Sequence, residues 1–167
     1  FLKIPLAFHI LILLTIIIAA ILAAKKRLTL DIKKHFTILV FLIFLAIYWL
    51  VAITGKLNIG VRNLLPTFPF IYLLVVLLLK KILAKLTLPY KRVLLVFIFF
   101  LFGWYVASSL SSFPYYLSYF NLLAGGTENG YKYAVDSNYD WGQDFYRLVS
   151  FVEKNNIQKI YLDYFGG

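Results

Sequence analysis

The chain has 167 residues, of which 62% are hydrophobic and 19% aromatic, and its formal net charge at pH 7 is +10. The hydrophobic share is well above the roughly 45–50% of a soluble domain, which excludes an ordinary water-soluble fold. Cysteine is absent, so the sequence excludes a disulfide framework, a zinc–thiolate site and a thiol nucleophile. Methionine is absent as well, and we therefore expect the chain to be the C-terminal part of a longer protein.

The positive charge is unevenly distributed along the sequence. Residues 1–127 contain a single acidic residue, Asp31, among many lysines and arginines, whereas residues 128–167 carry more acidic than basic side chains. Basic residues beside apolar segments meet anionic lipid headgroups and set the orientation of a membrane protein. We therefore expect membrane lipids, and no nucleic acid, to be the partners of these basic residues.

Four apolar stretches are candidates for helices that cross a membrane. They cover residues 4–24, 36–54, 64–79 and 93–110, and the third is short against the ~20 residues that a spanning helix needs. The sequence thus predicts an all-α polytopic membrane region over residues 1–112.

Two of the three connections between these stretches are strongly basic, which predicts the orientation. The connection between the first and second stretches contains Lys25, Lys26, Arg27, Lys33 and Lys34. The connection between the third and fourth stretches contains Lys80, Lys81, Lys85, Lys91 and Arg92. Because cytoplasmic loops carry the excess of Lys and Arg, we expect both connections to be cytoplasmic and both ends of the chain to be outside. The predicted location is the plasma (inner) membrane, with several spans and an extracytoplasmic C-terminal segment.

The predicted spans contain few groups that could do chemistry. None of them contains Asp, Glu, Lys or Arg, and we interpret His9 as a packing or interface residue. At the start of the third span, Arg62 precedes Pro66 and Pro69, which lack a backbone N–H and loosen the first turns. Arg62 is therefore a candidate for binding a lipid-linked phosphate, because its guanidinium group can bond two phosphate oxygens at once. The alternative is that Arg62 only extends to lipid headgroups.

Residues 113–167 form a second, more polar region. Residues 113–123 are predicted to lie on the outer membrane surface, and a helix is predicted from residue 141 to residue 155. The segment Ile157–Tyr164 is rich in β-branched and aromatic residues and is predicted to be a strand. A helix followed by a strand predicts the start of a small extracytoplasmic α/β domain.

A cluster of polar residues precedes and overlaps the predicted outer helix. Its members are Asp136, Asn138, Asp140, Trp141, Gln143 and Asp144. Carboxylates and amides beside an exposed indole suit contact with a sugar in an outer cavity, and we assign no metal site to them. The alternative is that Asp140 and Gln143 only cap the helix, while Asp144 stabilises its positive end.

Two segments of the chain resemble one enzyme family. They are Gly60–Phe70, which reads GVRNLLPTFPF, and Tyr116–Asp144, which contains YLSYFNLLAGG and DSNYDWGQD. Together they resemble the C-terminal half of bacterial membrane proteins related to the dolichyl-phosphate-mannose protein mannosyltransferases, glycosyltransferase family 39 of the C-type superfamily. The resemblance covers both motifs and the arrangement of the spans, whereas residues 4–24 match only as a hydrophobic helix.

The resemblance implies a many-span enzyme that moves a mannose-like sugar from a polyprenyl-phosphate carrier to a protein or glycan acceptor at the outer membrane face. Arg62 would then contact the carrier phosphate, and residues 136–144 would line the outer cavity. The catalytic acidic residue of such enzymes lies in the first outer loop, which no segment here matches, so we assign no catalytic residue and expect the chain alone to be inactive. A divalent metal in the complete enzyme is compatible with the resemblance. A transporter or flippase-like protein and a non-catalytic anchor for an outer α/β domain are the alternatives.

Overall fold

The computed structural model describes residues 2–28, 36–55, 60–134, 139, 142 and 144–162. The α-helices among them are α1 (Leu6–Ala24), α2 (Phe36–Thr54), α3 (Phe68–Lys85), α4 (Leu88–Leu110) and α5 (Phe145–Lys154), and the 3-10 helices are η1 (Gly60–Thr67), η2 (Leu122–Ala124) and η3 (Gly130–Lys132). The chain divides into two compact units, which are described separately. The first contains Lys3–Ser111, and the second contains Ser112–Gly167 together with Leu2.

Among the described residues of the first unit, four helices are long and apolar enough to cross a membrane, which agrees with the four predicted spans. Their large apolar side chains are mostly exposed, and α2 has no buried residue. A helix that exposes apolar side chains all round needs an apolar surrounding, and a helix satisfies its backbone hydrogen bonds internally. The four helices are therefore suited to lipid rather than to water.

The predicted boundaries are right for α2 but wrong for the end of the third span and for the start of the fourth, since α4 begins at Leu88 rather than at residue 93. Helix α2 begins and ends where the sequence predicts, at Phe36 and Thr54. The third span is not short: α3 continues past residue 79 through two lysines to Lys85, and the connection to α4 consists of Leu86 and Thr87. Hydropathy ends a predicted span at the first cation, but the long apolar stem of lysine is compatible with a helix whose charged end reaches the headgroups.

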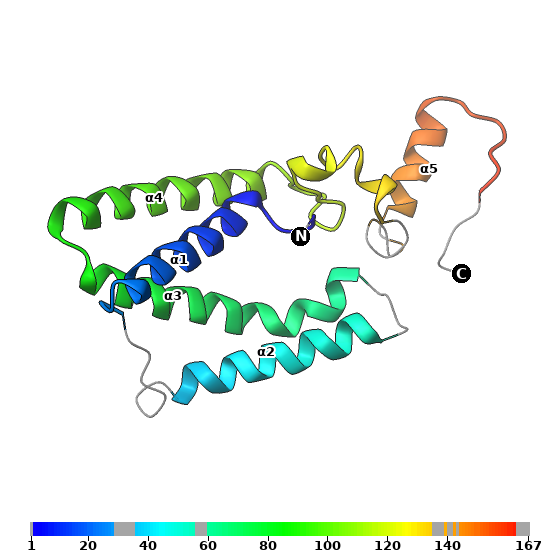
Figure 1. The fold of residues 1–167 in the computed structure, drawn as a ribbon. Coiled ribbons are helices and arrows are strands. Elements are labelled where there is room, and N and C mark those ends of the chain that lie inside the picture. The colour runs from blue at the N-terminus through cyan, green and yellow to red at the C-terminus, as the bar shows by residue number, and fades with distance from the viewer. Residues whose placement is uncertain are drawn as a thin grey trace. The chain divides into compact units, whose positions relative to one another are not determined.

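Helix packing in the first unit brings the two basic connections to the same end. Helix α1 packs against α3 and α4, and α2 packs against α3 and η1 (Figure 1). The end where α1 and α3 finish and α4 begins is closed by one buried cluster, made of Leu22, Leu28, Ile82 and Leu94. We call it the basic end, because the described cations of both connections lie next to this cluster in sequence.

The opposite end of the first unit is aromatic. The ring of Phe8 near the start of α1 lies 4.6 Å from that of Tyr72 in α3 and 6.5 Å from that of Tyr105 in α4, measured between centroids. The hydroxyl groups of Tyr72 and Tyr105 are 3.4 Å apart and share a hydrogen bond. The bundle thus has an aromatic end, which is also where η1 leads into α3, and a basic end.

The second unit differs from the predicted α/β segment. Helix α5 begins at Phe145, so Gly142 and Asp144 lie before the helix rather than inside it. The predicted strand is not formed: its described part, Ile157–Leu162, contains neither helix nor strand. A strand is stable only when its backbone groups pair with a neighbouring strand, and the described residues of this unit provide none.

Candidate functional site

The first motif, which carries Arg62, forms the 3-10 helix η1 directly before α3. Pro66 lies inside it, one residue before its end, and has no backbone N–H to donate there. The side chain of Thr67 is fully buried, and its Oγ1 donates a hydrogen bond to the carbonyl of Leu64 at 2.7 Å. The indole N–H of Trp49 in α2 donates to the same Oγ1 at 3.4 Å. These contacts attach η1 to α2 and fix where Arg62 and its neighbours lie.

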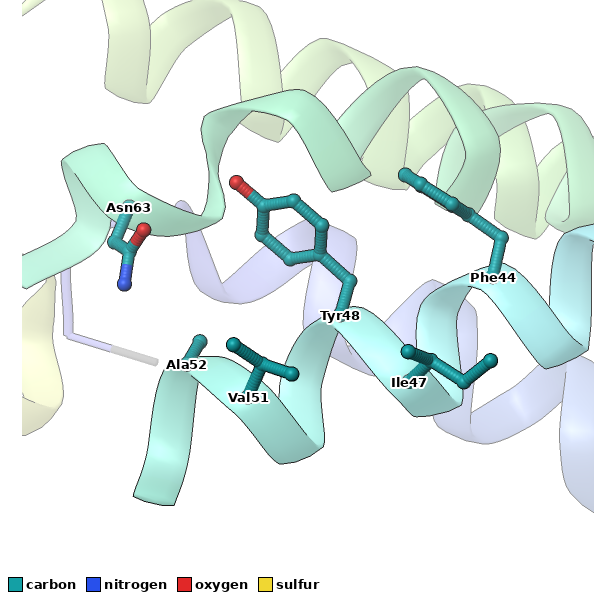
Figure 2. A pocket seen from close by; sticks show the side chains of 6 residues that line it. All are labelled: Phe44, Ile47, Tyr48, Val51, Ala52 and Asn63. Carbon is teal, nitrogen blue, oxygen red and sulfur yellow. The ribbon is translucent and has the colours of Figure 1, made fainter. Parts of the chain in front are cut away.

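A cavity of about 320 Å³ opens between α2 and η1. Figure 2 shows Asn63 projecting from η1 toward α2, and the hydroxyl of Tyr48 projecting from α2 toward η1. The remaining walls are apolar and come from Phe44, Ile47, Val51 and Ala52. Such a cavity can accept an apolar group and can offer two hydrogen-bonding side chains at its η1 side.

Arg62, the predicted phosphate-binding residue, is half-buried and precedes Asn63 in η1. Successive residues of a 3-10 helix point about 120° apart, so Arg62 and Asn63 project in different directions. Asn63 lines the cavity and Arg62 does not. Asn63 was not predicted as a site residue, although an amide beside an arginine at an apolar boundary was the available signal.

The predicted outer polar cluster is only partly described by the structure. Five of its members lie outside the described residues: Asp136, Asn138, Asp140, Trp141 and Gln143. Their roles in sugar contact or helix capping stay predictions.

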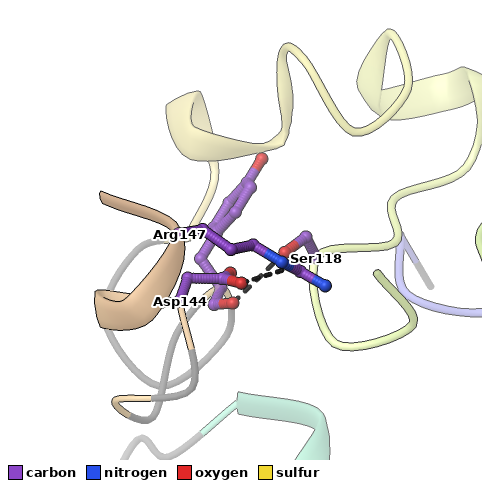
Figure 3. A network of polar contacts seen from close by, with 4 residues as sticks. Ser118, Asp144 and Arg147 are labelled. Carbon is purple, nitrogen blue, oxygen red and sulfur yellow. Dashed lines mark hydrogen bonds and ion pairs between the residues drawn. The ribbon is translucent and has the colours of Figure 1, made fainter. Parts of the chain in front are cut away.

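Asp144, the remaining member of the cluster, is paired with Arg147 one turn further into α5. Its carboxylate accepts a hydrogen bond from Arg147 Nη1 at 2.6 Å (Figure 3). The guanidinium of Arg147 also lies over the ring of Tyr115, 4.3 Å from its centroid. Asp144 is the N-cap residue of α5 but makes no side-chain capping hydrogen bond. The contact places Asp144 at the positive end of α5, and its role in sugar contact stays a prediction.

Asn121, which was not predicted as a site residue, makes several hydrogen bonds within the second motif. Its buried side chain accepts a hydrogen bond from the Leu123 N–H at 3.0 Å, which caps η2. Its own N–H donates to the carbonyl of Leu2 at 2.8 Å, and its carbonyl accepts from the N–H of Gly126 at 3.1 Å. Gly125, between them, has a φ of 75°, which a glycine adopts without steric cost. The NLLAGG segment is therefore a tight, internally bonded turn.

A second set of contacts in this motif centres on Tyr139. Its ring stacks on Phe120 with 5.2 Å between centroids, and its hydroxyl donates to the carbonyl of Thr127 at 2.6 Å. Ser118 Oγ donates to the Tyr139 carbonyl at 3.2 Å. Burial raises the pKa of the Tyr139 phenol. Gly130 is buried against this pair, and a Cβ there would collide with the Phe120 ring and the Tyr139 hydroxyl. These contacts hold Phe120, Gly130 and Tyr139 together in the second motif.

Within the described part of the chain, no three His, Asp or Glu side chains lie close enough together to hold a metal ion. Comparisons of the chain with protein-family models, with curated proteins and with solved structures found no match.

Proposed function

We propose that the chain is part of an integral membrane glycosyltransferase that takes a mannose-like sugar from a polyprenyl-phosphate carrier. The acceptor is a hydroxyl group of a protein or glycan at the outer membrane face. The observation that carries the proposal is the first motif, which resembles that of the family and forms an irregular segment at the end of a spanning helix. There, Asn63 lines an apolar cavity, and Arg62 directly precedes it in η1.

The role proposed for Arg62 follows from the charge that develops in the reaction. As the acceptor oxygen bonds to the anomeric carbon, the bond from that carbon to the carrier phosphate breaks and the phosphate gains negative charge. A guanidinium group can bond two oxygens of this leaving group and stabilise it. The acceptor proton passes to a carboxylate, for which the resemblance points to the first outer loop of such enzymes and to no residue of this chain.

The orientation we propose places the basic end of the first unit in the cytoplasm and η1 at the outer face. It is supported by the gathering of both basic connections at one end, since cytoplasmic loops carry the excess of Lys and Arg. The aromatic end then lies at the opposite interface, where Tyr and Trp are enriched. The proposed location is the plasma (inner) membrane.

The test uses membranes that contain the complete protein as its gene encodes it. Transfer of labelled mannose from polyprenyl-phosphate mannose is measured for the unchanged protein and for Arg62→Ala, Arg62→Lys and Arg92→Ala. Losing a charged hydrogen-bonding partner of about 1.5–3 kcal/mol should lower kcat/KM for the donor about 10- to 150-fold in Arg62→Ala. Arg62→Lys should keep part of the rate, because lysine retains the charge without the bidentate geometry.

Arg92→Ala is the matched control, because it removes an arginine from the start of α4, at the basic end. It should leave transfer unchanged. Unchanged kinetics in Arg62→Ala, with an active parent protein, would refute the phosphate role alone. A parent protein that is inserted in the membrane and transfers no sugar from any lipid-linked donor, but moves a substrate across vesicles, would instead favour the transporter.

A further inference from the structure

A groove between α3 and α4 combines an apolar wall with lysine side chains. It has a volume of about 480 Å³ and is lined by Val76, Leu79, Lys80, Leu83, Lys91 and Leu95, among others. Lys80 lies in the last turns of α3 and Lys91 in the first turn of α4, so both lie toward the basic end of the first unit. One end of the groove is therefore basic, and the rest of its lining is apolar.

The apolar part of the groove continues toward the aromatic end. A neighbouring cavity of about 510 Å³ shares the lining residues Val76, Leu79 and Ile98 with the groove and reaches Tyr105. At 1.5 Å per residue, the helix from Lys91 to Tyr105 rises about 21 Å, compared with a hydrocarbon core of about 30 Å. The lined surface is thus long enough for one acyl chain that starts at the lysines.

The charge at the lysine end has no counterpart among the described residues of the first unit. None of residues 2–28, 36–55 and 60–111 is Asp or Glu, while Lys85 and Arg92 lie close to the groove in sequence. The ammonium group of Lys81 is buried and finds no hydrogen-bond partner in the described part of the chain. The occupant that complements this end is an anion.

We propose that the groove binds an anionic glycerophospholipid, with its phosphate between Lys80 and Lys91 and one acyl chain against Val76, Leu79 and Leu95. Basic pockets between spanning helices bind such headgroups, and each lysine near the surface contributes about 1 kcal/mol to the attraction. The acyl chain would cover apolar side chains that the protein itself leaves exposed, such as Val76, which is 61% exposed. The inference does not depend on the proposed transferase activity.

The experiment measures lipid binding to the purified complete protein by native mass spectrometry and by thermal stability in detergent. Phosphatidylglycerol, phosphatidylcholine and inorganic phosphate are each titrated. The variants are Lys80→Ala/Lys91→Ala and a control that removes the same charge from the same end, Lys25→Ala/Lys26→Ala, whose side chains do not line the groove. We expect selective retention of phosphatidylglycerol, about 30-fold weaker binding in the groove variant and little change in the control.

Three results would overturn the proposal. They are equal binding of phosphatidylglycerol and phosphatidylcholine, an equal loss in both double variants, and equal stabilisation by inorganic phosphate, which would indicate a site for soluble anions. Val76→Trp provides a test that keeps both lysines, because an indole at this exposed position fills the groove. It should reduce retention of phosphatidylglycerol at unchanged charge, and it replaces the double variant if that variant does not fold.

Discussion

Gly130→Ala is expected to disrupt the second motif, although it adds only one methyl group. The new Cβ would occupy space held by the Phe120 ring and the Tyr139 hydroxyl, so the ring pair must move. Overpacking a well-filled site costs about 1–3 kcal/mol, and loss of the hydrogen bond from Tyr139 to the Thr127 carbonyl adds about 1 kcal/mol. The expected loss of local stability is therefore about 2–4 kcal/mol.

Hydrogen exchange of the complete chain measures this loss directly. Amides in residues 120–134 that donate within the motif, such as those of Gly126 and Ala134, should exchange about 30- to 1,000-fold faster, or at the unprotected rate if their protection is smaller. Gly103→Ala is the matched control, since its Cβ meets no atom within 4 Å and alanine favours a helix. Unchanged exchange in Gly130→Ala would refute the packing described for Phe120 and Tyr139.

Three further predictions concern other groups. Asn121→Ala removes the acceptor of the Leu123 N–H and should cost about 1–3 kcal/mol, seen as faster amide exchange at Leu123; an unchanged rate would contradict the cap. Because burial raises the pKa of Tyr139, the stability that its neutral phenol contributes should be present below pH about 10 and be lost as the pH rises through the raised pKa. Absorbance titration of the protein, compared with Tyr139→Phe, measures this pKa. A phenol that titrates at its ordinary value would contradict the prediction. The chain lacks cysteine, so single Ser111→Cys and Lys25→Cys variants report orientation: an impermeant maleimide should label the first in intact cells and the second only after permeabilisation, and the reverse pattern would invert the orientation.

Periodic and compositional features of the fold were predictable, because they depend on single segments. The bounds of α2 follow from an uninterrupted apolar run. The end of α3 could not be predicted in the same way, since Lys85 belongs to the helix despite its charge. The strand predicted at Ile157–Tyr164 rested on residue preference alone, whereas a strand needs a partner that no local pattern specifies.

The candidate sites were predictable to different degrees for the same reason. Arg62 was selected as a candidate because a cation before prolines stands out in an apolar sequence, and its phosphate role stays a prediction. The contact between Trp49 and Thr67 joins residues of two helical segments and has no signature in either of them. The structural role of Gly130 comes from the Phe120 ring and the Tyr139 hydroxyl packed against it, which no local sequence pattern specifies.

The two proposed binding chemistries lie at opposite ends of the first unit, and this makes them separable. Arg62 belongs to η1, beside the aromatic end, whereas Lys80 and Lys91 lie toward the basic end. Charges separated by most of a bilayer interact weakly, so removing one site should not change the electrostatics of the other. Arg62→Ala should therefore change donor kinetics without changing phospholipid retention, and Lys80→Ala/Lys91→Ala should do the reverse. A variant that changed both donor kinetics and phospholipid retention would indicate that the helices between the two ends shift together. The charge of Arg62 and the charges of the two lysines are too far apart to act on each other directly.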